Sequence, residues 1–185
     1  MIIIWITWTL GSGKGTIVDY LVENKWFQHL SVRAFLIEEI KKRSMKIDRD
    51  SMTLVANDLR TKFGSSYIVE QLYTQAKASW KNSCIESIRA VGEVELLQKK
   101  ENFYLFAIDA DPAIRYERIK IRNSESDKVS YAKFLSDEQR EMNTIDPTKQ
   151  NLSRCMEMAD HVFTNNWTLE ELNQQIEEVI NTLNI

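Results

Sequence analysis

A glycine-rich loop with a lysine at its centre constrains this chain more than any other feature. Residues 11–16 read Gly-Ser-Gly-Lys-Gly-Thr and lie between an apolar run, expected to be a buried strand, and an expected helix. In that context the glycines let backbone N–H groups point at phosphate oxygens, and the helix N-terminus adds its dipole. Lys14 supplies a mobile positive charge, which a turn that only connects two elements does not need. The loop therefore predicts a phosphate site formed by Gly11, Ser12, Gly13, Lys14, Gly15 and Thr16.

The same loop resembles the phosphate-binding loop (P-loop) of nucleoside monophosphate kinases, whose adenylate-kinase branch also carries GSGKGT. It departs twice from the pattern G-x-x-x-x-G-K-[ST]. Gly15 follows Lys14, so the hydroxyl comes one step later, at Thr16, as it does in adenylate kinases. The first glycine of the pattern falls on Trp8, where an indole is hard to fit. The resemblance implies ATP and Mg²⁺ as cofactors, and we expect the metal beside Thr16 and Glu86.

Strand-like and helix-like segments alternate along the rest of the chain. This alternation predicts an α/β fold, a three-layer αβα arrangement with a parallel five-stranded sheet, as in P-loop NTPases. We expect one kinase domain over residues 1–185, with a small helical lid at about 123–150, where the sequence is polar and holds no obvious strand. The expected strands are 2–6, 29–31, 82–86, 103–109 and 161–164, and the expected helices 17–24, 33–43, 51–62, 66–78, 91–99, 112–122, 136–143 and one opening at Thr168.

An acidic residue ends the third expected strand, and an arginine follows it. A carboxylate at the carboxyl end of a parallel strand faces the ligand crevice in this fold class. Glu86 could therefore orient Mg²⁺ through water or accept a proton from the substrate hydroxyl, and Arg89 could bind a phosphate. The segment resembles the Asp-Gly-x-x-Arg stretch of small nucleotide kinases, with Glu in place of Asp. The alternative is a salt bridge between the two residues.

Three arginines share one face of the helix expected at 112–122. Arg115, Arg118 and Arg122 stand at i, i+3 and i+7. Like charges on one face repel, unless an anion such as a triphosphate lies there. The segment resembles the E-R-x-x-x-R at the lid hinge of adenylate kinases, which implies that Arg118 and Arg122 contact ATP. The alternative is a solvated basic face.

Further candidate residues lie on the acceptor and adenine sides. Arg33 and Arg60 fall in the region that binds the phosphate acceptor in such kinases, and each could equally be a surface charge. The stretch 159–168 resembles the end of dephospho-coenzyme A kinases, which implies that Asn165 lies near the adenine.

All five tryptophans stand where glycine suits the expected structure better. Trp26 and Trp80 follow helix ends, where glycine is the usual left-handed cap, and Trp167 lies in a turn before a capped helix. Trp5 and Trp8 align with glycines of related kinases. The chain has only 5 glycines, against roughly 13 from average usage. One hypothesis is that the gene uses UGA codons for glycine, translated here as tryptophan. The alternative is five ordinary aromatic residues, some of them in the core.

Charge and cysteine content narrow the class of protein. Lys and Arg total 24 and Asp and Glu total 27, a formal charge of −3, so nucleic acid and membrane surfaces are not expected partners. Cys84 and Cys155 are too few for a disulfide framework and fit a reducing compartment. The first apolar run is too short for a membrane span or a signal peptide. We therefore expect a soluble cytoplasmic protein of undetermined oligomeric state.

These features together predict an ATP-dependent phosphotransferase. The γ-phosphate of Mg·ATP would move to a small nucleotide, with a (deoxy)nucleoside monophosphate as the favoured acceptor and dephospho-coenzyme A as the second. A nucleotide-binding regulatory module without turnover is the alternative from another class, favoured by Trp8 and by the missing hydroxyl at position 15. The expected catalytic residues are Lys14, Glu86, Arg118 and Arg122, and the expected acceptor-binding residues are Arg33, Arg60 and Arg89.

Overall fold

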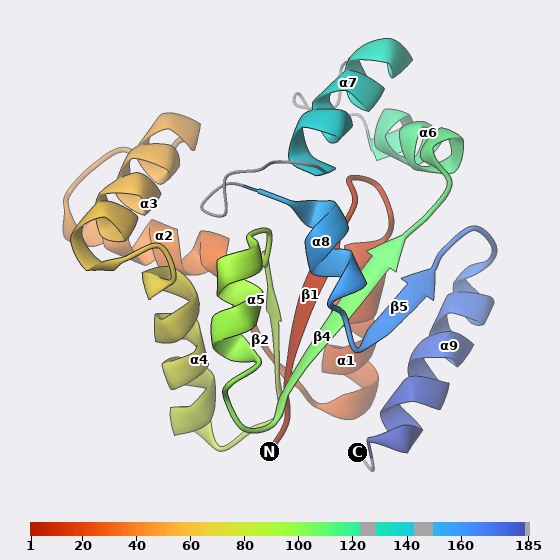
Figure 1. Ribbon diagram of the computed structural model, residues 1–185, viewed down its shortest axis with the longest axis horizontal. Coiled ribbons are helices and arrows are strands. Elements are labelled where there is room, and N and C mark those ends of the chain that lie inside the picture. Colours follow the sequence, from red (N-terminus) through yellow and green to blue (C-terminus); the bar gives the residue numbers. More distant parts are fainter. Residues whose placement is uncertain (123–128, 143–149, 184–185) are drawn as a thin grey trace.

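The computed structural model describes residues 1–122, 129–142 and 150–183. Its centre is a sheet of five parallel strands in the order β2-β3-β1-β4-β5. Because the strands are parallel, their carboxyl ends share one edge of the sheet, which lies at the top of Figure 1. The strands are β1 (Ile3–Trp8), β2 (Gln28–Ser31), β3 (Ser83–Glu86), β4 (Phe103–Asp109) and β5 (His161–Thr164).

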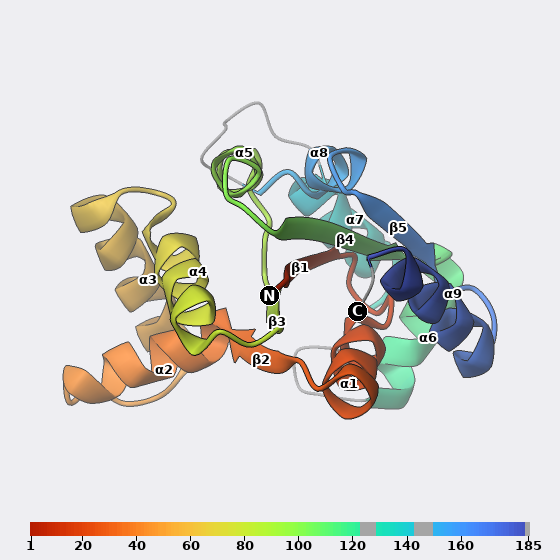
Figure 2. The same ribbon diagram turned by 90° about the horizontal axis from the view of Figure 1, so that it is seen from below.

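Helices cover both faces of this sheet, so the predicted three-layer αβα fold is confirmed. Figure 2 shows α1 and α9 on one side of the sheet, and α5 and α8 on the other. In Figure 1, α6 and α7 lie above the carboxyl ends of the strands. The helices are α1 (Lys14–Lys25), α2 (Val32–Lys42), α3 (Arg49–Phe63), α4 (Tyr67–Ser79), α5 (Val91–Leu97), α6 (Pro112–Arg122), α7 (Tyr131–Met142), α8 (Leu152–Glu157) and α9 (Leu169–Thr182).

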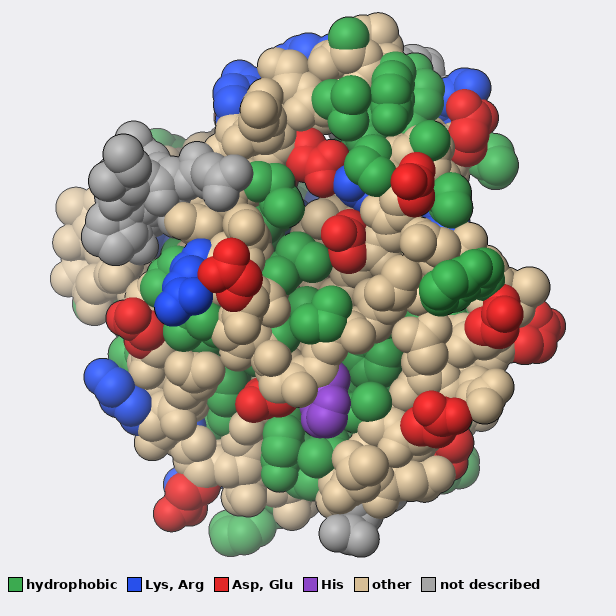
Figure 3. Space-filling view, turned by 45° about the vertical axis from the view of Figure 1, so that its right-hand side comes forward, with side chains coloured by type: hydrophobic (Ala, Val, Ile, Leu, Met, Phe, Trp, Pro, Cys, Tyr) green, Lys and Arg blue, Asp and Glu red, His purple; other side chains and the backbone are tan. Residues whose placement is uncertain are grey.

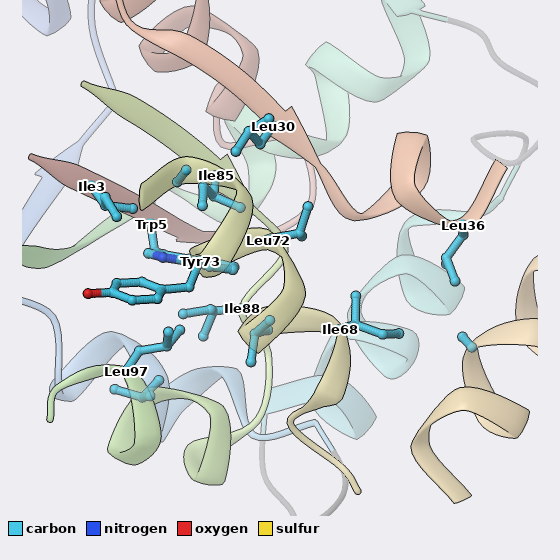
Figure 4. Packing of buried hydrophobic residues seen from close by; sticks show 14 of the residues in the cluster. Ile3, Trp5, Leu30, Leu36, Ile68, Leu72, Tyr73, Ile85, Ile88 and Leu97 are labelled. Atoms are coloured by element: carbon cyan, nitrogen blue, oxygen red, sulfur yellow. The ribbon is translucent and has the colours of Figure 1, made fainter. Parts of the chain in front are cut away.

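The core divides into two hydrophobic clusters, one on each face of the sheet. Successive side chains of a strand point to opposite faces, so Ile3 and Trp5 join the cluster under α4 and α5. Ile4 and Ile6 join the cluster under α1 and α9. Figure 4 shows the Trp5 indole beside the ring of Tyr73 in the first cluster. A strand that is apolar on both faces is what a central parallel strand requires.

Most element boundaries follow the sequence expectations. The strands 103–109 and 161–164 and the helix 112–122 match the structure at both ends. The Asp111 carboxylate accepts a hydrogen bond of 2.8 Å from the backbone N–H of Ala113, as expected of a cap. The capping box of Thr168 and Glu171 is also present, with both reciprocal bonds. These helix starts are specified by their caps.

Three helices differ from the expectation. Helix α1 begins at Lys14 rather than at 17, because the end of the glycine-rich loop is already the first helical turn. Helix α7 begins at Tyr131 rather than at 136. Helix α8 was not expected, because its six residues are too few to show a clear hydrophobic period. Its cap is nevertheless ordinary, since the Asn151 side chain accepts a hydrogen bond from the backbone N–H of Arg154.

The surface carries no strong charge pattern on the face shown in Figure 3, where Lys and Arg side chains lie apart among acidic and neutral ones. No helix of the described part is long and apolar enough to cross a membrane. Cys84 and Cys155 are both free and buried, and burial raises the pKa of each thiol to about 12. The two thiols therefore behave as small core residues.

Candidate active site

The glycine-rich loop runs from the end of β1 to the first turn of α1, and two of its glycines have left-handed backbone. Gly11 has φ 84° and Gly13 has φ 103°. A Cβ at Gly11 would lie 2.7 Å from the carbonyl oxygen of Arg115, and one at Gly13 would lie 2.3 Å from Nδ2 of Asn165. Both positions therefore need glycine for space as well as for conformation.

A cleft of about 410 Å³ opens beside this loop. The basic side chains that line it come from three parts of the chain: Lys14 from α1, Arg89 from the segment after β3, and Arg118 and Arg122 from α6. The predicted catalytic cations are thus brought to one place by the fold. The remaining lining residues are Trp8, Leu10, Gly11, Ser12, Gly13, Gly15 and Ile119.

Lys14 and Glu86 meet at the carboxyl ends of β1 and β3. The Lys14 ammonium contacts the Glu86 carboxylate, which also lies 3.5 Å from Nε2 of His29 at β2. Burial, with help from the cations Arg89 and Arg122, lowers the pKa of Lys14 to about 8. Burial and the Lys14 charge lower the pKa of His29, which favours a neutral imidazole. His29 was not expected at the site, because the pairing of its strand with that of Glu86 is set by the strand order of the sheet.

Asn165 connects the loop to α6 from the end of β5. Its side-chain amide donates a hydrogen bond of 2.7 Å to the carbonyl of Ser12. Its own carbonyl and side-chain oxygens accept bonds of 2.9 and 3.3 Å from the guanidinium of Arg118. Burial lowers the pKa of Arg118 from its usual value. Asn165 therefore positions both the loop and a cationic side chain of the cleft.

Arg115 does not share the cleft with Arg118 and Arg122, so the predicted three-arginine face is wrong in one member. Its side chain is only 2% exposed and forms an ion pair of 2.6 Å with Glu138 of α7. It also donates to the backbone carbonyls of Ala110 (2.7 Å) and Leu10 (3.2 Å). The three positions share one face, but Arg115 lies near the start of α6, where that face meets Glu138 of α7 and the carbonyls of Ala110 and Leu10 instead of the cleft.

Arg89 reaches from the cleft to α7. It does not pair with Glu86, the alternative considered from the sequence, but with Glu141 of α7 at 3.0 Å. It also donates a hydrogen bond of 3.3 Å to the Gln150 side chain. Of the lid expected at 123–150, residues 123–128 and 143–149 lie outside the described part, whereas α7 is helical as expected. Arginine–glutamate pairs through Arg89 and Arg115 thus connect α7 to the rest of the site.

Arg33 and Arg60 do not line the cleft. Arg33 is exposed in the first turn of α2, and Arg60 is half-buried in α3. Arg60 lies close enough to the buried Glu93 to oppose the rise in the pKa of that carboxyl, which burial causes. Glu93 accepts bonds of 3.3 Å from the backbone N–H groups of Arg89 and Ala90, and so positions the segment that carries Arg89.

Sequence analysis also missed a contact between Thr9 and Asp109. The Thr9 hydroxyl donates a hydrogen bond of 2.5 Å to the Asp109 carboxylate, and the Thr9 carbonyl accepts one of 2.8 Å from Ser12. Both residues are polar and lie at the carboxyl ends of neighbouring strands. Polar residues at strand ends are the sequence feature that could have indicated this contact. The contact fixes the start of the loop to the end of β4.

The residues expected at a metal fit Mg²⁺ only if phosphate oxygens complete its coordination. No group of three or more His, Cys, Asp or Glu side chains suited to a metal occurs among the described residues. Glu86 supplies one carboxylate, mostly shielded from solvent. Thr16, the other expected ligand, does not line the cleft but a separate pocket between α1 and α9, with Tyr20 and Asn173. Mg²⁺ in phosphoryl-transfer sites is held by one or two protein oxygens, waters and substrate phosphates. The residues present fit that mode.

Comparison with known proteins supports the fold. No protein-family model matches the sequence. The chain is 24% identical to a UPF0200 protein of Thermococcus kodakarensis, covering 98% of this chain and 97% of that protein. Shikimate kinase from Bacteroides thetaiotaomicron superposes with a TM-score of 0.60 at 12% identity, over 97% of this chain and 98% of that one. Dephospho-CoA kinase from Campylobacter jejuni does so with a TM-score of 0.50 at 16% identity, over 97% and 96%. The fold is thus one that small kinases share.

Proposed function

We propose that this protein transfers the terminal phosphoryl group of ATP to a small nucleotide acceptor. The observation that carries the proposal is the cleft, in which Lys14, Arg118 and Arg122 lie with the glycine-rich loop. Backbone N–H groups of the loop and the N-terminus of α1 suit the β-phosphate, and the three cations suit the charge on the transferring group.

Each residue has a role that its position supports. When ATP binds, Lys14 breaks its contact with Glu86 and neutralises phosphate charge beside the loop. Arg118 and Arg122 stabilise the charge that spreads over the transferring phosphoryl group. With a monophosphate acceptor the attacking atom is an ionised phosphate oxygen, so Glu86 has no proton to accept and would orient a water on the metal. Only a hydroxyl acceptor, as in dephospho-coenzyme A, would give Glu86 the role of a general base. Glu86 would hold Mg²⁺, with Thr16 proposed as a second ligand, and the metal would supply positive charge to the phosphates.

The acceptor in this proposal carries a phosphate of its own. Arg89 lines the same cleft and pairs with Glu141. If Arg89 left Glu141 and paired with the acceptor phosphate, its positive charge would bind the acceptor. A (deoxy)nucleoside monophosphate meets this requirement. Arg33 and Arg60 do not line the cleft, so they are proposed as acceptor contacts only in a conformation of the protein in which α2 and α3 lie closer to it. The kinases named above act on shikimate and dephospho-coenzyme A, so the shared fold leaves the acceptor to experiment.

One observation bears on the alternative of a binding module without turnover. Lys14 is in contact with Glu86, and its ammonium also lies 4.5 Å from the Trp8 ring centroid. A lysine held in this way is less available to phosphate. The same contacts are expected of a kinase without its substrates, in which they keep the cation paired.

An acceptor panel separates the two functions. The protein is incubated with Mg·ATP and each common nucleoside monophosphate, deoxynucleoside monophosphate or dephospho-coenzyme A, and products are identified by mass spectrometry. The same panel is run on Lys14→Ala and on Lys99→Ala, a matched change at an exposed lysine outside the cleft. A phosphorylated acceptor that disappears only with Lys14→Ala supports the kinase. ATP binding without any transfer favours the binding module.

A further inference from the structure

Two of the five tryptophans hold a backbone conformation that suits glycine. Trp26 has φ 59° and ψ 29° after α1, and Trp80 has φ 55° and ψ 18° after α4. Only a few per cent of non-glycine residues have positive φ, and a bulky residue there is an outlier. Two such cases among five tryptophans are expected by chance in about one chain in a hundred.

The side chains at these two caps contribute little packing in return. Trp26 is 86% exposed and Trp80 is 82% exposed. The other non-glycine residues with positive φ in the described part are small and polar: Ser44, Ser87 and Asn102. Glycine is the usual residue at a left-handed helix C-cap, because it has no Cβ to clash.

Trp8 occupies a place in the cleft where a phosphate site needs room. Its ring centroid lies 4.5 Å from Nζ of Lys14 and 4.9 Å from Cζ of Arg89. Two cations of a phosphate cleft thus face an indole. The position is also the first glycine of the G-x-x-x-x-G-K pattern that ends at Lys14.

Trp5 adds weaker support, and Trp167 adds none. Trp5 is fully buried, and its indole N–H has no hydrogen-bond partner among the described residues. Buried tryptophans usually find one. Trp167 is 61% exposed before the cap of α9, but its φ is not positive, so the predicted need for glycine in that turn is not supported by the backbone.

We infer that positions 5, 8, 26, 80 and 167 are glycine in the protein that the source cell makes, because that cell reads UGA as glycine. A codon assignment applies to every UGA, so the evidence at positions 26 and 80 extends to each of positions 5, 8 and 167 that UGA encodes. The consequence for the site is a phosphate loop with all of its glycines and a wider cleft between Lys14 and Arg89.

The gene and the native protein test this inference directly, without reference to the proposed function. All five codons should be UGA, and tryptic peptides from the source cells should carry glycine at positions 26 and 80. A UGG codon at any of the five positions, or peptides that retain tryptophan, would overturn it.

Variants made in an ordinary host provide a second test. Trp26→Gly and Trp80→Gly should each raise the Tm, whereas Trp26→Ala and Trp80→Ala, which also remove the ring but keep a Cβ, should raise it less. Equal Tm values for the glycine and alanine variants would contradict a backbone requirement for glycine. The chain with all five changes should fold cooperatively, and a chain that stays unfolded would count against the inference, since Trp5 is then needed in the core.

The effect on the cleft rests on the proposed function and is measured separately. Trp8→Gly should bind ATP at least tenfold more tightly than the protein with tryptophan at position 8, because Lys14 and Arg89 no longer face an indole. If native peptides carry glycine but Trp8→Gly leaves the ATP affinity unchanged, the argument about the phosphate site is contradicted. The codon assignment would still hold.

Discussion

At the scale of single residues, Asn165 connects the glycine-rich loop to Arg118 of α6. It fixes the Ser12 carbonyl and orients the Arg118 guanidinium at the same time. Asn165→Ala should lower the free energy of unfolding by about 1–3 kcal/mol, since the amide bond to the loop is buried. It should also weaken ATP binding. Asn24→Ala, at an exposed position of α1, is the matched control in denaturation and calorimetry, and an equal loss there would refute this role for Asn165.

Lys14 gives the site a pH dependence. Its pKa is lowered to about 8, so its ammonium is protonated below that value and becomes neutral as pH rises through it. ATP affinity should therefore fall above pH 8, by up to about tenfold per pH unit. Lys14→Arg, which stays charged, should show a flat profile over the same range. A falling profile in both proteins would assign the effect to another group.

The same shift makes a separate contribution to folding, with the opposite sign. The unfolded lysine has the ordinary pKa of 10.5, so between about 8 and 10.5 the unfolded state binds more protons than the folded state. Stability from this group therefore rises with pH across that window. The loss of ATP affinity above pH 8 is thus not a sign of unfolding, and a Tm measured across the window checks this.

At the scale of helices and strands, Arg115 joins β4, the loop and α7. The guanidinium is buried and bonds to Ala110, Leu10 and Glu138. Arg115→Met removes one partner of a buried pair and should destabilise the fold by about 3–5 kcal/mol. Arg154→Met removes the exposed pair with Glu157 and should cost less than about 1 kcal/mol. Chemical denaturation compares the two, and similar losses would mean that Arg115 has no special coupling role.

The pair of Arg89 and Glu141 is expected to work differently, because it is partly exposed. Glu141→Gln should leave stability nearly unchanged and release Arg89 for the acceptor phosphate. In the acceptor assay KM should fall while kcat changes little. Glu157→Gln, in an exposed pair remote from the cleft, is the control. A raised KM would show instead that Glu141 itself helps to bind the acceptor.

Local patterns predicted most elements, and tertiary packing decided the rest. The apolar run 103–109 and the capping residues Asp111 and Thr168 specify their elements without help from the fold. Helix α8 is too short to leave a periodic pattern, and it forms because its apolar face packs on the sheet. The orientation of Arg115 likewise depends on α7, which no spacing rule places.

At the scale of the whole molecule, the parallel sheet explains why residues far apart in sequence form one cleft. Glu86 ends β3, Asn165 follows β5, and Lys14 follows β1 through the loop. All three strands end at the same edge. The alternation of strands and helices predicted this edge. The strand order, and with it the approach of His29 to Glu86, follows only from the assembled sheet.

The destination of the terminal phosphoryl group of ATP tests the central claim most directly. The measurement uses γ-labelled ATP, Mg²⁺ and the acceptor panel. It is made on the protein with all five tryptophans and on the variant in which all five are changed to glycine (Trp5, Trp8, Trp26, Trp80 and Trp167). The account predicts that label moves to one nucleotide acceptor and that Lys14→Ala abolishes the transfer. Label that stays on ATP, or appears only as inorganic phosphate with every acceptor, would contradict it.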